Sequence, residues 1–428
     1  MMTKAEELKT TVLHSYHLEQ SANMAEFGGY DMPLWYPSGT KAEHLAVITQ
    51  AGLFDTSHMA VITIEGSGTF DLLQHSFSKD LLRCQNRGMA PLSEGRSVYG
   101  LLLNSDGTVL DDAIIGQLGE ERYMMVVNSG MGSAVGAHLR ELAQGQATIT
   151  DYSDKLGKID LQGPASARIL ENLFSDPDSV LADMAYFSFK GDIFPGGSAT
   201  LELKDGTRVI LSRTGYTGEF GFELFTEKAK ALNLWQMILA AGRPFGLLPC
   251  GLAARDSLRA GAMLPLSHQD IGNWVFGHTP WSFVLPWDND GESWTKSFVG
   301  AQRLLQSERD YTYGFAGYDP RKISAGSSSE VKAEDGTTIG KVLTCTTDMA
   351  IGRVEERIVS IATPVSKGRP EAYQPRGLSC GFVRVDRPCL PGELVWLVEG
   401  KRKLKVEIRK SIRPDRTARA PMAQMRSS

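Results

Sequence analysis

The sequence predicts an α+β protein in which two subdomains are interleaved and a small β-barrel follows at the C-terminus. Strands and helices alternate in two stretches that lie about a hundred residues apart, which favours interleaved α+β subdomains. Short strands dominate the chain from residue 311 onward, a pattern typical of a barrel. With 428 residues the chain is too long for one compact domain. We therefore expect a core at residues 1–305 and a barrel domain at residues 306–428.

The composition is that of a folded globular enzyme. Hydrophobic residues make up 42% and charged residues 22% of the chain, unlike the composition of disordered proteins. A net charge of −5 predicts no bulk attraction to nucleic acid or to an anionic membrane, so local Arg or Lys side chains must meet any anionic ligand. No long apolar run and no apolar signal core occur, which predicts a cytoplasmic protein without a membrane span.

The cysteines give no sign of a disulfide or a metal site. Their number is odd, and they are scattered without C-x-x-C or Cys/His ligand spacing. We expect reduced thiols and no metal ion. The residues concerned are Cys84, Cys250, Cys345, Cys380 and Cys389.

Amphipathic patterns and end signals predict the helices of the core. Thr40 and Glu43 fit a capping box at the start of one helix, and Pro164 suits the first turn of another. Residues 30–37, which are aromatic and bounded by prolines, are expected to form a loop. Helices are expected at residues 5–25, 40–51, 67–82, 130–142, 164–173, 229–241 and 252–259.

Alternating apolar runs predict the strands, and Asn104-Ser105-Asp106-Gly107 predicts a hairpin between two of them. Core strands are expected at residues 60–64, 99–103, 108–116, 123–128 and 156–161. Barrel strands are expected at residues 314–317, 339–344, 381–385, 393–398 and 401–408.

The strand after the hairpin contains two adjacent acids, Asp111 and Asp112. Because side chains alternate between the faces of a strand, these two cannot point the same way. A partly buried carboxylate needs hydrogen-bond donors or an opposite charge. We therefore expect one acid to be solvated and the other to be held in a site. His58 has no partner histidine at ligand spacing and is expected to be a satisfied structural residue.

Residues 211–224 are the strongest local candidate for a ligand site. Their sequence is Leu-Ser-Arg-Thr-Gly-Tyr-Thr-Gly-Glu-Phe-Gly-Phe-Glu-Leu, with glycines at every third position. Sharp turns at Gly215, Gly218 and Gly221 would direct the polar groups toward one space. From the residues alone, a glycine-rich β-hairpin with solvated acids remains the alternative.

Two further features bear on ligands. Arg255 and Arg259 lie four apart on one face of a predicted helix, which is typical of a salt-bridged surface or of a carboxylate clamp. The chain lacks G-x-G-x-x-G and P-loop patterns, so no nucleotide diphosphate cofactor is indicated.

Residues 211–224 resemble the central signature of the folate-dependent aminomethyltransferases, the T-protein family of the glycine cleavage system. The likeness ends near residue 300. Further segments resemble the same family in the same order, at residues 27–33, 51–59, 103–112, 127–128, 162–164, 251–259 and 298–300.

The resemblance implies a transferase that moves an aminomethyl carbon from the lipoyl arm of a carrier protein to tetrahydrofolate and releases ammonia. It implies that Asp112 is the catalytic residue beside the folate nitrogen N5, and that Asp111 faces solvent or a structural partner. Glu223 would accept the pterin N–H groups, and Arg255 would pair with the tail carboxylate. The folate-binding residues that it implies are Met59, Tyr99, Asn128, Tyr216, Glu223 and Arg255.

The sequence also departs from the family pattern. After Arg259 the family continues Leu-Glu-Ala-Gly and then Tyr-Gly-x-Glu, whereas here residues 260–263 read Ala-Gly-Ala-Met and residues 267–270 read Ser-His-Gln-Asp. Residues 351–374 look like an insertion. These changes affect the donor side more than the folate side.

Two alternatives to the aminomethyltransferase therefore remain. One is a folate-dependent methyltransferase or demethylase that acts on a small methylated compound. The other is a non-catalytic folate-binding accessory protein, but residues 211–224 lack the cysteine of its Lys-Gly-Cys-Tyr-x-Gly-Gln-Glu signature. The expected partners are folate and a lipoyl carrier protein, and neither nucleic acid nor a membrane.

Overall fold

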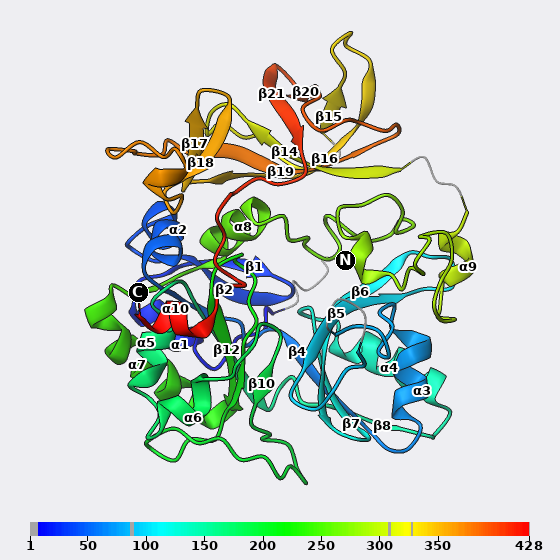
Figure 1. Cartoon of the computed structure of the whole chain (residues 1–428), viewed down its shortest axis with the longest axis vertical. Coiled ribbons are helices and arrows are strands. Elements are labelled where there is room, and N and C mark those ends of the chain that lie inside the picture. Colours follow the sequence, from blue (N-terminus) through cyan, green and yellow to red (C-terminus); the bar gives the residue numbers. More distant parts are fainter. Residues whose placement is uncertain (1–6, 86–89, 307–309, 327, 428) are drawn as a thin grey trace.

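The computed structural model describes residues 7–85, 90–306, 310–326 and 328–427. Two sheets with their helices form the lower part of the molecule in Figure 1, and a closed barrel lies above them. The predicted α+β class with a C-terminal barrel is therefore confirmed.

The two lower subdomains are interleaved along the chain, as predicted. Strand β3 (Gly52–Asp55) and strand β4 (Ala60–Glu65) are consecutive but belong to different sheets. β3 pairs with β9 (Leu156–Gln162), which follows much later in the chain, whereas β4 pairs with β7 (Arg122–Val127). The segment between β3 and β4, which includes His58 and Met59, therefore crosses from one sheet to the other.

The first sheet has five antiparallel strands in the order β5-β6-β7-β4-β8. The hairpin that joins β5 to β6 is where Asp106-Gly107 predicts it. The remaining elements of this subdomain are β5 (Ser97–Leu103), β6 (Val109–Gly119), β8 (Thr148–Asp151), α3 (Thr69–Ser76) and α4 (Gly132–Ala143).

The second sheet has six strands in the order β10-β11-β12-β9-β3-β13. Trp235 on α7 is fully buried in the core between this sheet and its helices. The strands are β10 (Phe189–Lys190), β11 (Ile210–Ser212), β12 (Gly221–Glu227) and β13 (Leu248–Pro249). The helices are α2 (Thr40–Thr49), α5 (Ser166–Glu171), α6 (Pro177–Leu181), α7 (Ala231–Gly242) and α8 (Leu252–Gly261).

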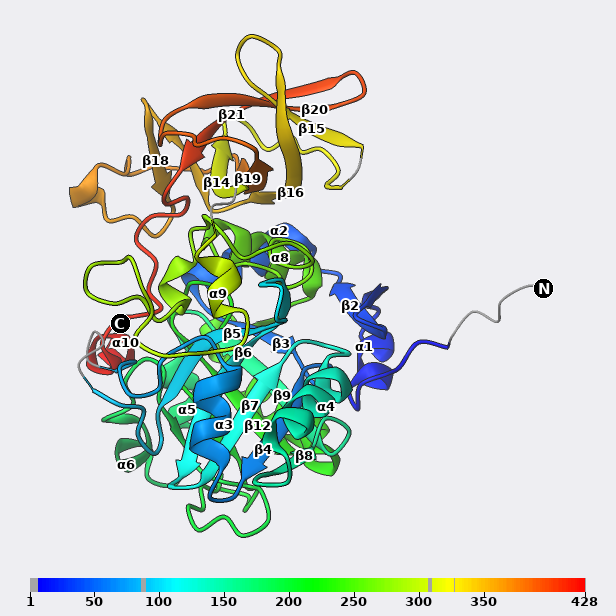
Figure 2. The ribbon, with the colours of Figure 1, turned by 90° about the vertical axis from the view of Figure 1, so that its right-hand side faces the viewer.

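The C-terminal barrel closes in the order β14-β19-β16-β15-β20-β21 and rests on α8 (Figures 1 and 2). Leu404, Val406 and Ile408 point into the barrel core, which explains the alternation of basic and apolar residues in its last strand. Its strands are β14 (Tyr311–Gly317), β15 (Ser329–Lys332), β16 (Thr338–Asp348), β19 (Leu378–Val385), β20 (Leu394–Glu399) and β21 (Arg402–Arg409). The expected insertion contains a separate hairpin, β17 (Ile351–Val354) and β18 (Arg357–Ser360).

The chain after β21 returns to the second sheet, where α10 (Met422–Ser427) packs near α5. On the way, the fully buried Arg413 donates to Asp348 at 2.5 Å and to Glu219 at 3.1 Å. Since Asp348 ends β16 and Glu219 lies in the glycine-rich segment, this residue ties the barrel to the core. Helix α9 (Ala301–Leu304) precedes the barrel.

Two expectations for the N-terminal region are wrong. A helix is expected at residues 5–25, of which residues 5 and 6 lie outside the described part of the chain. Residues 7–25 are α-helical only at α1 (His14–Glu19), because residues from Asn23 onward form β1 (Asn23–Phe27). The expected loop at residues 30–37 is instead mainly β2 (Tyr30–Trp35), which pairs with β1. The intervening Gly28 and Gly29 both have positive φ, which makes this tight hairpin possible.

The capping box is also wrong, although the helix that it predicts exists. The N-cap of α2 is Gly39, without a side-chain cap. The Glu43 carboxylate is fully buried and accepts hydrogen bonds from the backbone N–H of Tyr36 (2.6 Å) and Gly251 (2.9 Å). Glu43 therefore satisfies backbone N–H groups of two other segments, Tyr36 directly after β2 and Gly251 at the start of α8, and not those of its own helix.

Candidate functional site

A cavity of about 560 Å³ lies where the two sheets meet. It is lined by β5, β6, β7, β9 and β12, by the crossing segment at residues 58–59, by the loop at residues 263–266, and by Trp281 and Phe283. The structure brings together in this pocket all the site residues that the sequence predicts, namely Met59, Tyr99, Asp112, Asn128, Tyr216, Glu223 and Arg255.

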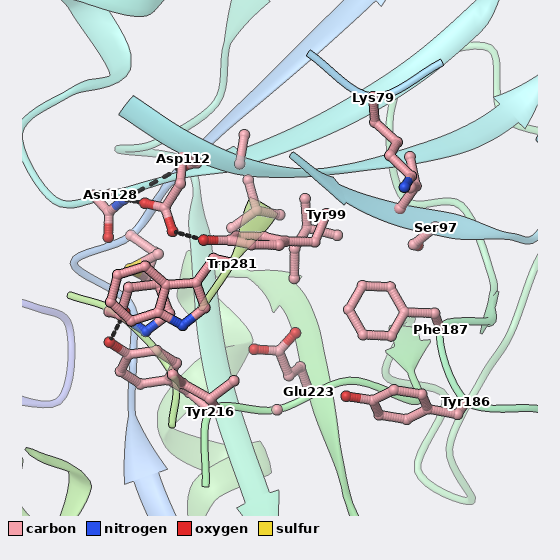
Figure 3. Close-up of a pocket in the computed structure, with 18 of the residues that line it drawn as sticks. Lys79, Ser97, Tyr99, Asp112, Asn128, Tyr186, Phe187, Tyr216, Glu223 and Trp281 are labelled. Carbon is pink, nitrogen blue, oxygen red and sulfur yellow. Dashed lines mark hydrogen bonds between the residues drawn. The ribbon is translucent and has the colours of Figure 1, made fainter. Parts of the chain in front are cut away.

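Asp112 lies at one end of the pocket and is held by two donors (Figure 3). The Tyr99 hydroxyl donates to Asp112 Oδ2 at 2.7 Å, and Asn128 Nδ2 donates to Asp112 Oδ1 at 2.6 Å. Burial raises the pKa of Asp112, and the two hydrogen bonds oppose this shift. The carboxylate is therefore fixed in orientation and partly shielded from water.

Asp111 does not face solvent, which corrects part of the sequence-based expectation. It is fully buried and accepts hydrogen bonds from the Asn128 backbone N–H at 3.0 Å, from Asn128 Nδ2 at 2.7 Å and from the Ser267 hydroxyl at 2.9 Å. Burial and the neighbouring charge of Asp112 raise the pKa of Asp111 to about 7. The two side chains thus extend from different faces of β6, yet both accept a hydrogen bond from the side-chain amide of Asn128.

Glu223 is anchored by β9, its neighbour in the sheet. Lys158 Nζ donates to Glu223 Oε1 at 2.6 Å and to Asp160 Oδ1 at 2.6 Å, and the Thr214 hydroxyl donates to Glu223 Oε2. Sequence reasoning missed Lys158 and Asp160. The available signal was two charged residues within the otherwise apolar segment 156–161.

Arg255 also has a partner inside the protein. Its Nη1 donates to Asp160 Oδ2 at 2.8 Å, and its guanidinium lies 4.8 Å from the ring centroid of Tyr216. Burial disfavours ionisation of Asp160, but the charges of Lys158 and Arg255 outweigh burial and lower its pKa to about 2. One chain of alternating charges thus runs from Glu223 through Lys158 and Asp160 to Arg255. We call these four residues the buried ion chain.

Arg259, four residues after Arg255, is buried and pairs with Asp256 (2.7 Å) and Asp270. Of the two readings of the arginine pair, the structure therefore favours salt bridges, although inside the protein and not on its surface.

The glycines of residues 211–224 have two different roles. Only Gly218 has a positive φ, of +79°. A Cβ atom at Gly215 would lie 2.0 Å from Gln162 Oε1, and one at Gly221 would lie 2.6 Å from the Leu161 carbonyl oxygen. The expected sharp turn therefore occurs at Gly218, whereas the other two allow close approach to β9.

His58 lies in the pocket wall and is not the satisfied residue that we expected. Its Nδ1 is buried and has no hydrogen-bond partner among the described residues. Burial lowers the pKa of His58 to about 4, so the imidazole is neutral at physiological pH. A neutral ring nitrogen without a partner leaves a polar group at the wall that a ligand or water can satisfy.

Sequence reasoning also missed the cations at the other end of the pocket, Lys79, Arg96 and Arg419, and the aromatic residues Tyr186 and Trp281. They come from loops and from the C-terminal tail, and no motif marks them.

The pocket combines the buried Asp112 at one end, aromatic walls and the carboxyl group of Glu223. Such a site suits a flat heterocycle with adjacent N–H donors and a reactive nitrogen. Within the described part of the chain, no group of three or more His, Cys, Asp or Glu side chains is placed to hold a metal ion. A search of the same residues finds no helix that is both long and apolar enough to cross a membrane.

Residues 13–282 match the family model described as the GCVT N-terminal domain. The aminomethyltransferase of Geobacillus kaustophilus is 40% identical over 266 residues, which cover 62% of this chain and 67% of that protein. The aminomethyltransferase of Bacillus subtilis is 31% identical over 350 residues, which cover 81% of this chain and 89% of that protein. The crystal structure of glycine cleavage system aminomethyltransferase T from Bartonella henselae superposes with a TM-score of 0.73 at 25% identity, covering 98% of this chain and 99% of that one.

Proposed function

The chain belongs to the GCVT family of aminomethyltransferases, and from this premise we propose that its pocket binds tetrahydrofolate with Asp112 beside the reactive nitrogen N5. The protein is a transferase with the function of the glycine cleavage T-protein. The relatives that match are aminomethyltransferases, which argues against the methyltransferase and accessory-protein alternatives.

The observation that carries the folate proposal is the hydrogen bonding around Glu223. A carboxylate has about four acceptor positions, two on each oxygen. Lys158 takes one on Oε1 and Thr214 takes one on Oε2, so each oxygen can accept one more N–H group. Glu223 is thus suited to accept two adjacent N–H donors of a pterin ring.

Folate supplies the nitrogens that receive the one-carbon unit. Asp112, held by Tyr99 and Asn128, would orient the folate and stabilise the positive charge that develops at the transferred carbon. Tyr216 and Met59 would line the ring, and the open Nδ1 of His58 gives one more polar contact at the wall. Hydrogen bonds within the protein fix the orientation of Asp112, and such preorganisation favours the reaction.

Arg255 fits the wall of the site better than the tail of the ligand. Its guanidinium covers the Tyr216 ring and donates to Asp160, so Arg255 already has a carboxylate partner within the protein. We therefore assign Arg255 to the support of Tyr216 and Asp160 and not to the folate tail.

The donor in this proposal is the aminomethyl group on the lipoyl arm of a carrier protein, and the location is the cytoplasm. A titration of the purified protein with tetrahydrofolate tests the first step, and the absence of binding at millimolar folate would overturn the proposal. A screen of one-carbon donors then tests the second step. We expect methylene-tetrahydrofolate from the carrier-bound aminomethyl group, whereas methyl-tetrahydrofolate from a small methylated donor would contradict it.

A further inference from the structure

Two charged side chains of the glycine-rich segment, Arg213 and Glu219, are buried outside the pocket. They are 2% and 4% exposed, and neither lines the cavity. A buried charged group needs hydrogen-bond partners or an opposite charge, and a ligand in the pocket does not supply them here. The partners come from the C-terminal tail, residues 410–427, which Figure 1 shows in red between the barrel and α10.

The tail holds Glu219 at both carboxylate oxygens. The Thr417 hydroxyl donates to Glu219 Oε2 at 2.7 Å, and the Thr417 backbone N–H donates to the same atom at 3.2 Å. Arg413 Nε donates to Glu219 Oε1 at 3.1 Å. Thr417 Oγ1 also accepts a hydrogen bond from the backbone N–H of Phe220 at 2.9 Å. The Thr417 hydroxyl therefore bridges the side chain of one residue of the segment and the backbone of the next.

The tail also satisfies the backbone of the turn at Gly218. The Ala418 N–H donates to the Gly218 carbonyl oxygen at 3.1 Å, and Arg413 Nη2 donates to the Thr217 carbonyl oxygen. The Arg213 guanidinium donates in the other direction, to the Ala418 carbonyl oxygen at 2.9 Å. These residues of the glycine-rich segment lie between β11 and β12 and belong to neither strand. The tail therefore supplies partners that a neighbouring strand would otherwise supply.

The turn at Gly218 is connected directly to the pocket. It follows Tyr216, which lines the cavity and whose hydroxyl donates to the Pro265 carbonyl oxygen in the pocket loop after α8. A Cβ atom at Gly218 would lie 2.6 Å from the Ala262 Cβ atom and 3.1 Å from Arg413 Nη2. The turn is thus packed between the start of that loop and the tail, and a shift of the turn would displace Tyr216.

We propose that Thr417 is a positioning residue, which holds the turn at Gly218 and through it the Tyr216 wall of the pocket. The inference rests on the proposed function, because the wall affects the reaction only when folate occupies the pocket. Among the described residues, the Thr417 hydroxyl forms hydrogen bonds with Glu219 and Phe220 only, so its removal breaks no ion pair.

The test compares Thr417→Val, which keeps the shape of the side chain but removes the hydroxyl, with Thr417→Ser, which keeps the hydroxyl. Turnover of the full chain is measured with the carrier-bound aminomethyl donor and varied tetrahydrofolate. In Thr417→Val, KM for tetrahydrofolate should rise about three- to tenfold, the effect of one or two lost hydrogen bonds, with kcat within about twofold. Thr417→Ser should keep both constants within about twofold. A residue that only stabilises the fold would leave both constants unchanged in every folded variant.

Hydrogen exchange without ligand gives a second measurement. We expect the amides of residues 217–220 to exchange about three- to tenfold faster in Thr417→Val, whereas those of β12 should be unchanged. The control is Ser411→Ala, which removes an exposed hydroxyl from the same tail and should behave like the unchanged protein. Thermal unfolding verifies that each variant is folded, and Thr417→Ala replaces Thr417→Val if the latter does not fold.

The inference requires both changes, so an unchanged KM or an unchanged exchange rate in folded Thr417→Val would overturn it. A Thr417→Ser variant as impaired as Thr417→Val would also overturn it. The same holds if neither Thr417→Val nor Thr417→Ala folds, because the hydroxyl would then support the fold as a whole. Absence of folate binding by the unchanged protein would instead refute the proposed function, and the exchange measurement would still decide whether Thr417 holds the turn.

Discussion

The two ends of the pocket treat charge in opposite ways. At the Asp112 end every charged side chain has a partner from the protein itself: Tyr99 and Asn128 for Asp112, and the buried ion chain for Glu223. At the other end the cations Lys79, Arg96 and Arg419 have only neutral partners among the described residues. The first end is therefore held together by buried charged pairs, whereas the second is not. Substitutions should cost more stability at the first end than at the second.

The largest effect should come from Lys158→Met. This change leaves two buried carboxylates, Glu223 and Asp160, without their shared cation, and removing one partner of a buried ion pair typically destabilises by about 3–5 kcal/mol. Urea unfolding measures the difference. Lys155→Met, an exposed lysine just before the same strand, is the control and should change stability by less than about 0.5 kcal/mol. Equal effects of the two changes would mean that the buried ion chain carries no special role.

Glu223→Gln should weaken folate binding by about 1.5–3 kcal/mol, the range for a hydrogen bond to a charged group. An amide presents one acceptor oxygen and an NH₂ group, so one of the two N–H donors of the pterin would meet a donor. Calorimetric titration gives the affinity. The exposed Glu227, on the same strand, supplies the control Glu227→Gln, and a loss of similar size there would contradict the assignment.

A smaller effect should appear in the pH dependence of stability. The pKa of Asp111 is about 7 in the folded state against 3.8 ordinarily, so between these values the folded protein binds a proton that the unfolded chain has lost. Stability should therefore fall as pH rises from about 4 through 7, by about 1–3 kcal/mol from this residue. Unfolding at pH 5 and pH 8 measures the change. The difference in stability between pH 5 and pH 8 should be smaller in Asp111→Asn. An unaltered difference in this variant would contradict the raised pKa of Asp111.

The smallest effect should come from the cations at the end of the pocket opposite Asp112. Because Arg96 and Arg419 have no carboxylate partner among the described residues, R96Q and R419Q remove no ion pair, and each should leave the free energy of unfolding within about 0.5 kcal/mol of the unchanged protein. Urea unfolding without ligand measures this. A loss above about 2 kcal/mol would mean that the two ends of the pocket do not differ as described.

Local patterns predicted much of this fold because they depend on near neighbours. The Asp106-Gly107 turn sets the β5–β6 hairpin, and alternation marks β6, β7 and β21. Predictions from local patterns were wrong where a contact with another segment determines the local structure. Glu43 looks like a helix cap but serves the N–H groups of Tyr36 and Gly251, and β1 exists only because β2 pairs with it.

The same division applies to the site. Resemblance to the family was enough to predict seven residues that meet in one pocket. The buried ion chain was not predicted, because it depends on how β9 and β12 pair. These strands are far apart in the sequence, and their register places Glu223 opposite Asp160. Lys79, Arg96 and Arg419 were not predicted, because no motif in the sequence distinguishes a cation that lines the pocket from one on the surface.

The central claim is that Asp112, and not Asp111, performs the chemistry. Asp112 lines the pocket, whereas Asp111 is buried against Asn128 and Ser267. The decisive measurement is the turnover of Asp112→Asn and Asp111→Asn in parallel, with saturating tetrahydrofolate and the carrier-bound aminomethyl donor. We predict that Asp112→Asn still folds and binds folate but loses turnover by about a hundredfold or more, as for removal of one electrostatic stabiliser. Asp111→Asn should affect mainly stability. Equal turnover in the two variants, or the larger loss in Asp111→Asn, would contradict the account.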